Sequence, residues 1–315
     1  MKNTQIPFLA GMVLIGCLGL GGCQLTESRT SLTHAPLTGR LVYVVSDDVR
    51  EYDLASGKRR VLFRHDGLLS PPLIDVDGTR FIVKRFLTGG MFLVGMDGQA
   101  HELGKGSDYE FFPAHGKLLY LTIPPGQSQS YPLLHEATLR ENRLESPRVA
   151  GGGPITSGRG RSILAISDDE ALMERYDEGY FINRRYTIYD LRTGLFTDLD
   201  FSRETCRAMA WRTRTQELIC ADPNGWALYS LDGRRTPIPG LRKRKFAIAV
   251  YVPQGDYVLG GGWRWSWKRG EIIDLHSYHF STGGARRVAK RISVGGGNAF
   301  WLPPRSAAEQ ERFPK

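Results

Sequence analysis

The stretch GGGWRWSWKRGE, residues 260–271, places three tryptophans at alternate positions with cations between and after them. Successive side chains of an extended strand point to opposite sides, so a strand here would put the rings on one side and the cations on the other. Such a row of rings can stack on sugars or anchor a protein partner, because tryptophan and arginine are enriched at binding hot spots. The alternative is that the rings pack on neighbouring elements and stabilise a long hairpin. We expect a ligand-binding surface made of Trp263, Arg264, Trp265, Trp267 and Lys268.

The segment SDDEALMERYDEGYFINRR, residues 167–185, is the acidic counterpart of that stretch. We expect an insertion with a helical turn around EALMERY, in which Asp168, Asp169 and Glu170 contribute to the same ligand-binding face or pair with its cations. The alternative is a solvated acidic flap. The segment has no recognisable ligand spacing for a divalent cation, and DVDGT lacks the rest of a calcium loop. We therefore expect no metal site and no cofactor.

The usual signatures of catalysis are missing from the sequence. It has no G-x-S-x-G elbow, no P-loop and no C-x-x-C after residue 23. His276 and His279 are three apart, so on a strand they would face opposite ways. We expect a non-enzymatic protein. The alternative is a hydrolase or lyase acting on carbohydrate, with acids and histidines in the connections between repeats: His65, Asp66, Asp108, Tyr109 and Glu110.

The N-terminus has the pattern of a targeting signal. Lys2 precedes an apolar run, residues 6–20, that is short for a membrane span. The run ends in LGGC, which resembles the lipobox of bacterial lipoproteins and implies cleavage before Cys23 and lipidation of that cysteine. LIGC, ending at Cys17, also fits, but cleavage there would leave an apolar mature end. An ordinary signal peptide and an uncleaved anchor helix are the alternatives. By the same resemblance Gln24 implies the outer membrane, where several acyl chains would hold the periplasmic body firmly.

Two further cysteines, Cys206 and Cys220, flank the segment RAMAWRTRTQELI. This segment has the pattern of a hairpin, which would bring the two cysteines close together. The compartment implied by the lipobox permits disulfides. A disulfide and a pair of buried thiols are both compatible with the sequence.

Short β-branched and aromatic segments alternate with tight turns throughout the rest of the chain, in the manner of all-β proteins. The pattern recurs at a spacing on the order of 40 residues, which is the range of propeller blades. YDLASG, YDLRTG, VGMDG and IDVDGTRFIV resemble the WD40-like repeats of the TolB-type β-propeller. The resemblance implies an all-β propeller, for which we count six blades, with seven as the alternative.

The first repeat lacks an innermost strand, and the last is followed by an orphan segment, GGGNAFWLPP. We expect these two to pair and close the ring, which removes exposed strand edges. The predicted organisation is a signal peptide at 1–22, a lipidated tether at 23–38, the propeller at 39–305 and a polar tail at 306–315.

The connectivity of a propeller predicts where ligands bind. Tight turns such as DVDG, PQG and LDGR would lie on one face, and the long connections, including the tryptophan stretch and the acidic segment, on the other. We expect this long-loop face to recognise an envelope protein or a glycan. Strand addition to a blade edge is a further possibility. The formal charge of +9 comes from scattered cations, which indicates solubility and mild attraction to membranes and not a nucleic-acid partner.

Overall fold

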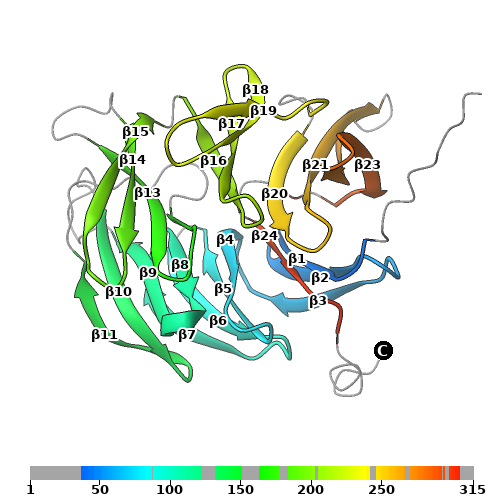
Figure 1. The fold of residues 1–315 in the computed structure, drawn as a ribbon. Helices are drawn as coiled ribbons and strands as arrows, with labels where there is room; N and C mark the ends of the chain where they lie inside the picture. The colour runs from blue at the N-terminus through cyan, green and yellow to red at the C-terminus, as the bar shows by residue number, and fades with distance from the viewer. Residues whose placement is uncertain are drawn as a thin grey trace, which may run out of the picture. The chain divides into compact units, whose positions relative to one another are not determined.

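The computed structural model describes residues 37–305, apart from 87, 123–131, 151–162, 177–183, 203–204, 242–245, 267–269, 293 and 295–297. These residues form six four-stranded antiparallel sheets arranged in a ring (Figure 1). The helical structure within this part of the chain is one short 3-10 turn, η1 (Pro113–His115). The predicted all-β propeller of six blades is confirmed.

We call the four strands of each blade a to d, from the inside of the ring outwards. Blade one consists of β24 (Ala299–Leu302), β1 (Arg40–Val45), β2 (Asp48–Asp53) and β3 (Arg59–Arg64). Blade two consists of β4 (Leu69–Asp75), β5 (Arg80–Arg85), β6 (Gly90–Gly95) and β7 (Ala100–Lys105). Blade three consists of β8 (Tyr109–Phe112), β9 (Lys117–Thr122), β10 (Leu133–Arg140) and β11 (Arg143–Val149). Blade four consists of β12 (Ile163–Ala165), β13 (Glu170–Tyr176), β14 (Arg184–Asp190) and β15 (Phe196–Ser202). Blade five consists of β16 (Arg207–Arg212), β17 (Glu217–Asp222), β18 (Gly225–Tyr229) and β19 (Arg235–Pro237). Blade six consists of β20 (Phe246–Val252), β21 (Tyr257–Ser266), β22 (Gly270–His279) and β23 (Gly284–Ala289).

The inner strands establish that the ring is closed. β24 contacts β4, β4 contacts β8, β8 contacts β12, β12 contacts β16, β16 contacts β20, and β20 contacts β24 again. The cycle returns to its starting strand after six steps, so the alternative of seven blades is wrong.

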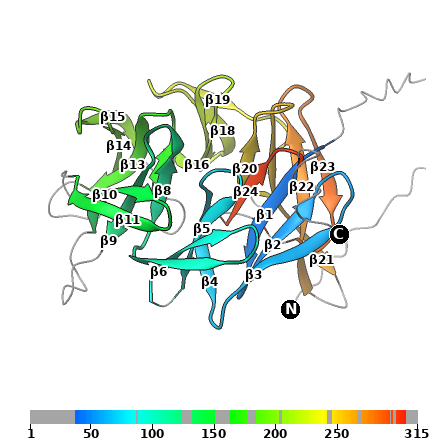
Figure 2. The same cartoon turned by 90° about the horizontal axis from the view of Figure 1, so that it is seen from below.

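The closing strand comes from the far end of the chain. β24 pairs antiparallel with β1, with Trp301 opposite Leu41, and lies between β1 and β20 (Figure 2). The indole Nε1 of Trp301 donates a hydrogen bond to the carbonyl of Thr38, at 3.1 Å. Gly39 lies against this ring with φ of +98°, and a Cβ there would collide with the indole. The expected pairing of the orphan C-terminal segment with the first blade is confirmed.

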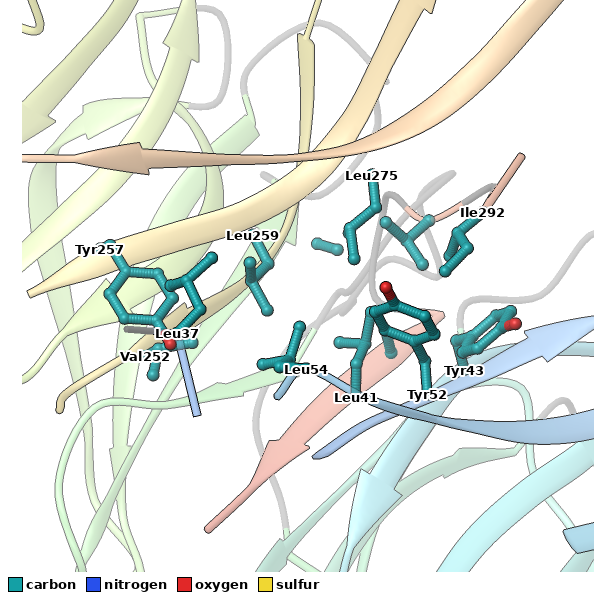
Figure 3. Close-up of a cluster of buried hydrophobic side chains, with 13 residues drawn as sticks. Leu37, Leu41, Tyr43, Tyr52, Leu54, Val252, Tyr257, Leu259, Leu275 and Ile292 are labelled. Atoms are coloured by element: carbon teal, nitrogen blue, oxygen red, sulfur yellow. The ribbon is translucent and has the colours of Figure 1, made fainter. Parts of the chain in front are cut away.

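The hydrophobic core is divided into six clusters, one at each boundary between neighbouring blades. Several of the strands a to c are buried on both faces, and such a strand appears in the sequence as a nearly continuous apolar run, as RLVYVV does in β1. At the closing boundary, Leu41 and Tyr43 pack against Leu259 and Leu275 of blade six (Figure 3). At the next boundary, Phe300 of the closing strand joins the cluster between blades one and two.

Replacing Phe300 by alanine tests how much the closing strand contributes to stability. The ring is 7% exposed and its centroid lies 6.3 Å from that of Phe81. We expect Phe300→Ala to lower the free energy of unfolding by about 3–5 kcal/mol, measured by urea unfolding. Phe86→Ala is the matched control, because Phe86 is 60% exposed, and it should leave the midpoint unchanged. Equal effects of the two substitutions would contradict a closing role for β24.

Buried carboxylates add polar links to this core. Asp256, which is 4% exposed, accepts two hydrogen bonds from Arg212 of β16, at 2.9 and 2.5 Å, and one from the Tyr251 hydroxyl at 3.0 Å. Burial alone would raise the pKa of Asp256, but the bonds from Arg212 and Tyr251 outweigh it and hold that pKa below its ordinary value. The pair therefore ties blade five to blade six through an ionised carboxylate.

Substituting Arg212 by glutamine tests how much the charge of Arg212 contributes to stability through that link. We expect Arg212→Gln to lower the free energy of unfolding by roughly 2–3 kcal/mol at pH 7, because the buried carboxylate keeps only the distant and exposed Arg214, at 3.8 Å. Without Arg212 the pKa of Asp256 rises, so the variant takes up a proton at a higher pH than the wild type does. The stability difference should therefore shrink as the pH falls through about 4.

The measurement is urea unfolding of both proteins at pH 7 and pH 4. Arg234→Gln is the control, because Arg234 forms an exposed pair with Asp232, and it should have little effect at either pH. A stability loss in Arg212→Gln that does not change with pH would mean that Arg212 acts by packing and not by its charge.

Candidate functional site

The connections between strands gather at two opposite ends of the ring. Because neighbouring strands are antiparallel, the a–b and c–d turns lie at one end, which we call the tight-turn rim. The b–c connections and the d–a connections between blades lie at the other end, which we call the long-loop rim. The tryptophan stretch belongs to the b–c hairpin of blade six, and so to the long-loop rim.

This hairpin projects beyond its blade. β21 and β22 are ten residues long each. β20 accompanies β21 only as far as Gly262, which lies opposite Phe246. From Trp263 to Ser266 β21 pairs with β22 alone, so a two-stranded ribbon of about 13 Å extends past the sheet, at about 3.3 Å per residue. The expectation that the strand continues through the tryptophan stretch is confirmed as far as Ser266.

The three glycines before the tryptophans form the tightly packed base of the ribbon. A Cβ at Gly260 would collide with the carbonyl oxygen of Ala247, and one at Gly261 with that of Val294. A Cβ at Gly262 would lie 2.6 Å from the ring of His276. Glycine is needed at the first two positions because backbone approaches them directly, and at the third because a side chain does. The base of the ribbon is thereby anchored to β20 and to the connection that leads to β24.

For the predicted ligand-binding residues of the ribbon, the structure describes part of the backbone and none of the side chains. Trp263, Arg264 and Trp265 are placed by the backbone pairing of β21 with β22, with Trp263 opposite Ile273. The side chains of these three residues lie outside the described part, as do Trp267 and Lys268 altogether. Their role in binding stays a prediction.

The acidic residues lie elsewhere than expected. Asp168 and Asp169 occupy the a–b turn between β12 and β13, and Glu170 begins β13, so all three lie at the tight-turn rim, opposite the ribbon. Asp169 contacts His115 Nε2 at 2.5 Å and Arg192 Nε at 3.4 Å. The prediction that these three residues share a rim with the tryptophan stretch is wrong.

The helical turn expected around EALMERY is wrong as well, because this segment is strand β13. Ala171 and Met173 pack in the cluster toward blade three, and Leu172 packs in the cluster toward blade five. A strand that is buried on both sides needs no alternation of polar and apolar residues, so its pattern resembles that of a short helix. Whether the acidic side chains bind a ligand stays untested, and the residues 177–183 lie outside the described part.

The polar residues considered for catalysis divide into two groups. His65 lies at the long-loop rim, where its Nε2 accepts a hydrogen bond from Arg85 at 2.8 Å and its ring packs 5.1 Å from that of Phe92. Asp108, Tyr109 and Glu110, by contrast, are at most 5% exposed. The Tyr109 hydroxyl donates to the carbonyl of Pro72, and burial raises the pKa of this tyrosine well above 10. These three residues belong to the interior of the ring.

Apolar side chains that the sequence did not single out are exposed at the long-loop rim. Leu68 and Phe86 are 55% and 60% exposed, and the amide of Phe86 donates to the carbonyl of Leu68 at 2.8 Å. On the next blade, Leu133 and Val149 are 41% and 54% exposed at neighbouring strand ends. The signal in the sequence was an apolar residue beside a turn, as in RFLTGG, but only the fold shows that these residues share a rim.

The last two cysteines of the chain are joined. Cys206 and Cys220 form a disulfide with a Cα–Cα distance of 5.2 Å, and both are fully buried. The bridge links the connection that enters β16 to strand β17, near the long-loop rim. Of the two possibilities that the sequence left open, the structure has the disulfide.

The part of the chain that the structure describes contains no cluster of three or more histidine, cysteine, aspartate or glutamate side chains placed to hold a metal ion. No helix within the same residues is long and apolar enough to cross a bilayer. Residues 1–36, which include Cys23, lie outside that part.

Comparison with known proteins identifies the fold. No protein-family model and no curated protein matches the sequence. Among solved structures, the chain is similar to TolB from Acinetobacter baumannii, with 13% identity over 86% of this chain and 68% of that one and a TM-score of 0.63. It is also similar to a putative TolB from Agrobacterium tumefaciens, with 10% identity over 85% of this chain and 100% of that one and a TM-score of 0.54. A chain of a nidogen/laminin complex is similar as well, with 9% identity over 81% of this chain and 97% of that one and a TM-score of 0.55. At these identities the similarity shows a TolB-like propeller fold.

Gly261 offers a test of the ribbon's packed base. We expect Gly261→Ala to lower the free energy of unfolding by about 1–3 kcal/mol, because the new methyl group would press on the Val294 carbonyl. Gly90→Ala is the control, since a Cβ in that strand glycine meets no atom closer than 3.6 Å. Thermal unfolding of both variants measures the difference, and a fully stable Gly261→Ala protein would show that the base is not tightly packed.

Proposed function

We propose that this protein is a non-enzymatic binding propeller, attached by a lipid on Cys23 to the periplasmic side of the outer membrane. It recognises an envelope protein through its long-loop rim. A protein partner is favoured over a glycan because this rim exposes four large aliphatic or aromatic side chains on two neighbouring blades.

The observation that carries the proposal is the distribution of exposed apolar residues. Among the described residues, six large hydrophobic side chains are exposed: Val61, Leu68, Phe86, Leu133, Val149 and Leu195. Four of these lie at the long-loop rim on the neighbouring blades two and three. Exposed apolar groups that gather on one surface mark sites of protein contact. The projecting ribbon of blade six rises from the same rim.

The interior position of Asp108, Tyr109 and Glu110 supports binding over catalysis. A general acid or base must reach the substrate, whereas these side chains are enclosed between blades. The carboxylate of Glu110 instead accepts a hydrogen bond from the amide of Ala165 in blade four, at 3.4 Å. The alternative of a carbohydrate hydrolase or lyase would therefore need other groups.

The location rests on the LGGC motif and is compatible with the disulfide. Disulfides persist in the periplasm and are rare in the cytosol, and the bridge between Cys206 and Cys220 is fully buried. A chain that is lipidated at Cys23 would keep the propeller at the membrane surface through the segment that precedes Leu37. One matched fold, in the nidogen/laminin complex, is itself part of a protein assembly.

Crosslinking in intact cells tests the proposal. Cells carrying the tagged wild type, the rim variant Leu68→Asp/Phe86→Asp or the control variant Val61→Asp/Leu195→Asp are treated with a crosslinker, and the captured proteins are quantified by mass spectrometry. All four positions are at least 47% exposed, so the folds should be equally stable. We expect a specific envelope protein to be captured by the wild type and by the control variant. The rim variant should capture at least tenfold less of that protein.

The same preparation reports on the anchor, because the mature N-terminal peptide should begin at an acylated Cys23 and the Cys23→Ser protein should leave the outer-membrane fraction. Equal capture by the rim variant and the wild type would contradict the assigned face. Turnover of an envelope glycan by the purified protein would contradict the non-enzymatic role.

A further inference from the structure

A cavity of about 380 Å³ opens at the tight-turn rim between blades one and two. It lies at the opposite end of the ring from the proposed protein-binding rim. Arg40, Arg60 and Arg305 line its blade-one side, and Arg80 lines its blade-two side, where His101 and Gln99 also contribute. These residues come from five separate segments of the chain.

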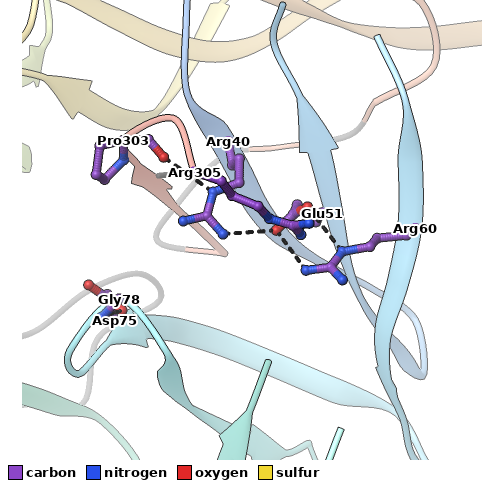
Figure 4. Close-up of polar contacts among 7 residues, drawn as sticks. All are labelled: Arg40, Glu51, Arg60, Asp75, Gly78, Pro303 and Arg305. Carbon is purple, nitrogen blue, oxygen red and sulfur yellow. Dashed lines mark hydrogen bonds and ion pairs between the residues drawn. The ribbon is translucent and has the colours of Figure 1, made fainter. Parts of the chain in front are cut away.

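The blade-one wall is organised around a single buried carboxylate. Glu51, with a side chain that is 6% exposed, accepts hydrogen bonds from Arg305 at 2.7 Å, from Arg60 at 3.0 and 3.2 Å and from Arg40 at 3.4 Å. Figure 4 shows the three guanidinium groups converging on Glu51, with the Asp75–Gly78 turn of blade two across from them. Arg40 also donates to the carbonyl of Pro303, at 3.2 Å. One negative charge thus holds three positive charges in fixed positions.

The blade-two wall holds its arginine in place in a similar way. Arg80 donates to Asp77 at 2.8 Å and to the carbonyl of Glu141, in the c–d turn of blade three, at 2.5 Å. Asp77 also accepts the amide of Thr79, at 3.0 Å. A guanidinium that is tied on both sides loses little further freedom when it binds a ligand.

Among the residues that line the cavity, basic side chains outnumber acidic ones. Four arginines and one histidine face it, against one lining carboxylate, Asp97. Among the carboxylates behind the lining, Glu51 and Asp77 are shared with arginines, and Asp75 is bonded to the amide of Gly78 at 2.9 Å. Guanidinium groups match carboxylates and phosphates in a bidentate geometry. The volume is in the range of small-molecule sites.

We propose that this arginine cavity binds a small anion that carries two or more carboxylate or phosphate groups. The arginines on its two walls belong to different blades, so one acidic group would contact Arg60 and its neighbours on blade one, and a second would contact Arg80 on blade two. A ligand with a single acidic group could use only one wall. The site is independent of the partner proposed for the long-loop rim.

The arginines could instead serve only to join blades one and two, and the sequence offers a matched pair of residues that separates these roles. Arg60 and Arg64 both lie on β3, and each donates to a buried carboxylate, Glu51 and Asp48 respectively. Each of these carboxylates keeps another arginine when its β3 arginine is removed. Only Arg60 lines the cavity. Arg60→Gln and Arg64→Gln therefore have similar structural costs but different expected effects on the ligand.

Isothermal titration calorimetry of the full-length protein in mild detergent at low ionic strength tests the proposal. Citrate probes for a polycarboxylate, pyrophosphate for a phosphate ligand, and acetate for a single acidic group. We expect citrate or pyrophosphate to bind with a Kd below about 1 mM. Acetate should bind at least tenfold more weakly, because it can make charge-assisted contacts with only one wall. Arg60→Gln and Arg80→Gln should each weaken binding at least tenfold, and Arg64→Gln less than twofold.

Three results would overturn the proposal. The first is that neither citrate nor pyrophosphate binds the wild type. The second is that Arg64→Gln weakens binding as much as Arg60→Gln, which would assign the effect to structure. The third is that citrate or pyrophosphate binds only to the double variant Glu309→Gln/Glu311→Gln. That result would mean that carboxylates of the chain's own C-terminal segment, and not an external anion, occupy the arginines.

Discussion

The pairing of β24 with β1 is the constraint on which the rest of this structure depends. Two strands from opposite ends of the chain complete one sheet, and through that sheet the sixth boundary between blades is formed. Each blade exposes two apolar faces, so none of them can be buried unless every blade has a neighbour on both sides. Closing the ring satisfies all six blades at once, and it also removes the free inner edge of β1.

The way in which the core is divided follows from this closure. A propeller has no single centre of hydrophobic packing, and the six clusters lie between blades. Contacts between blades therefore decide stability. Polar links reinforce the apolar ones: Arg212 binds Asp256 across blades five and six, and the Tyr189 hydroxyl donates to Glu136 across blades four and three, at 3.0 Å. Removing one member of such a pair would leave a buried polar group without its partner, which is destabilising.

A closed and evenly packed ring leaves its two rims to differ in chemistry. The long-loop rim exposes apolar side chains and carries a projecting ribbon, and it is suited to a protein surface. The tight-turn rim carries a cavity with fixed guanidinium groups and is suited to a small anion. The two proposals concern different rims and different ligand classes. A propeller can combine both because changes in the connections leave the sheets intact.

The sequence by itself determined the local structure: short strands, tight Asp-Gly and Ser/Thr-Gly turns, six repeats, and an orphan strand able to complete the first. These follow from side-chain period and turn chemistry, which act over a few residues. It failed at β13, where burial on both sides erased the alternation that distinguishes a strand, and so it placed Asp168 and Asp169 at the wrong rim. It left the state of Cys206 and Cys220 open. Only the tertiary structure brought Arg40, Arg60, Arg80 and Arg305 around one cavity and gathered Leu68, Phe86, Leu133 and Val149 on one rim, because such groupings depend on contacts between blades that leave no periodic trace in the sequence.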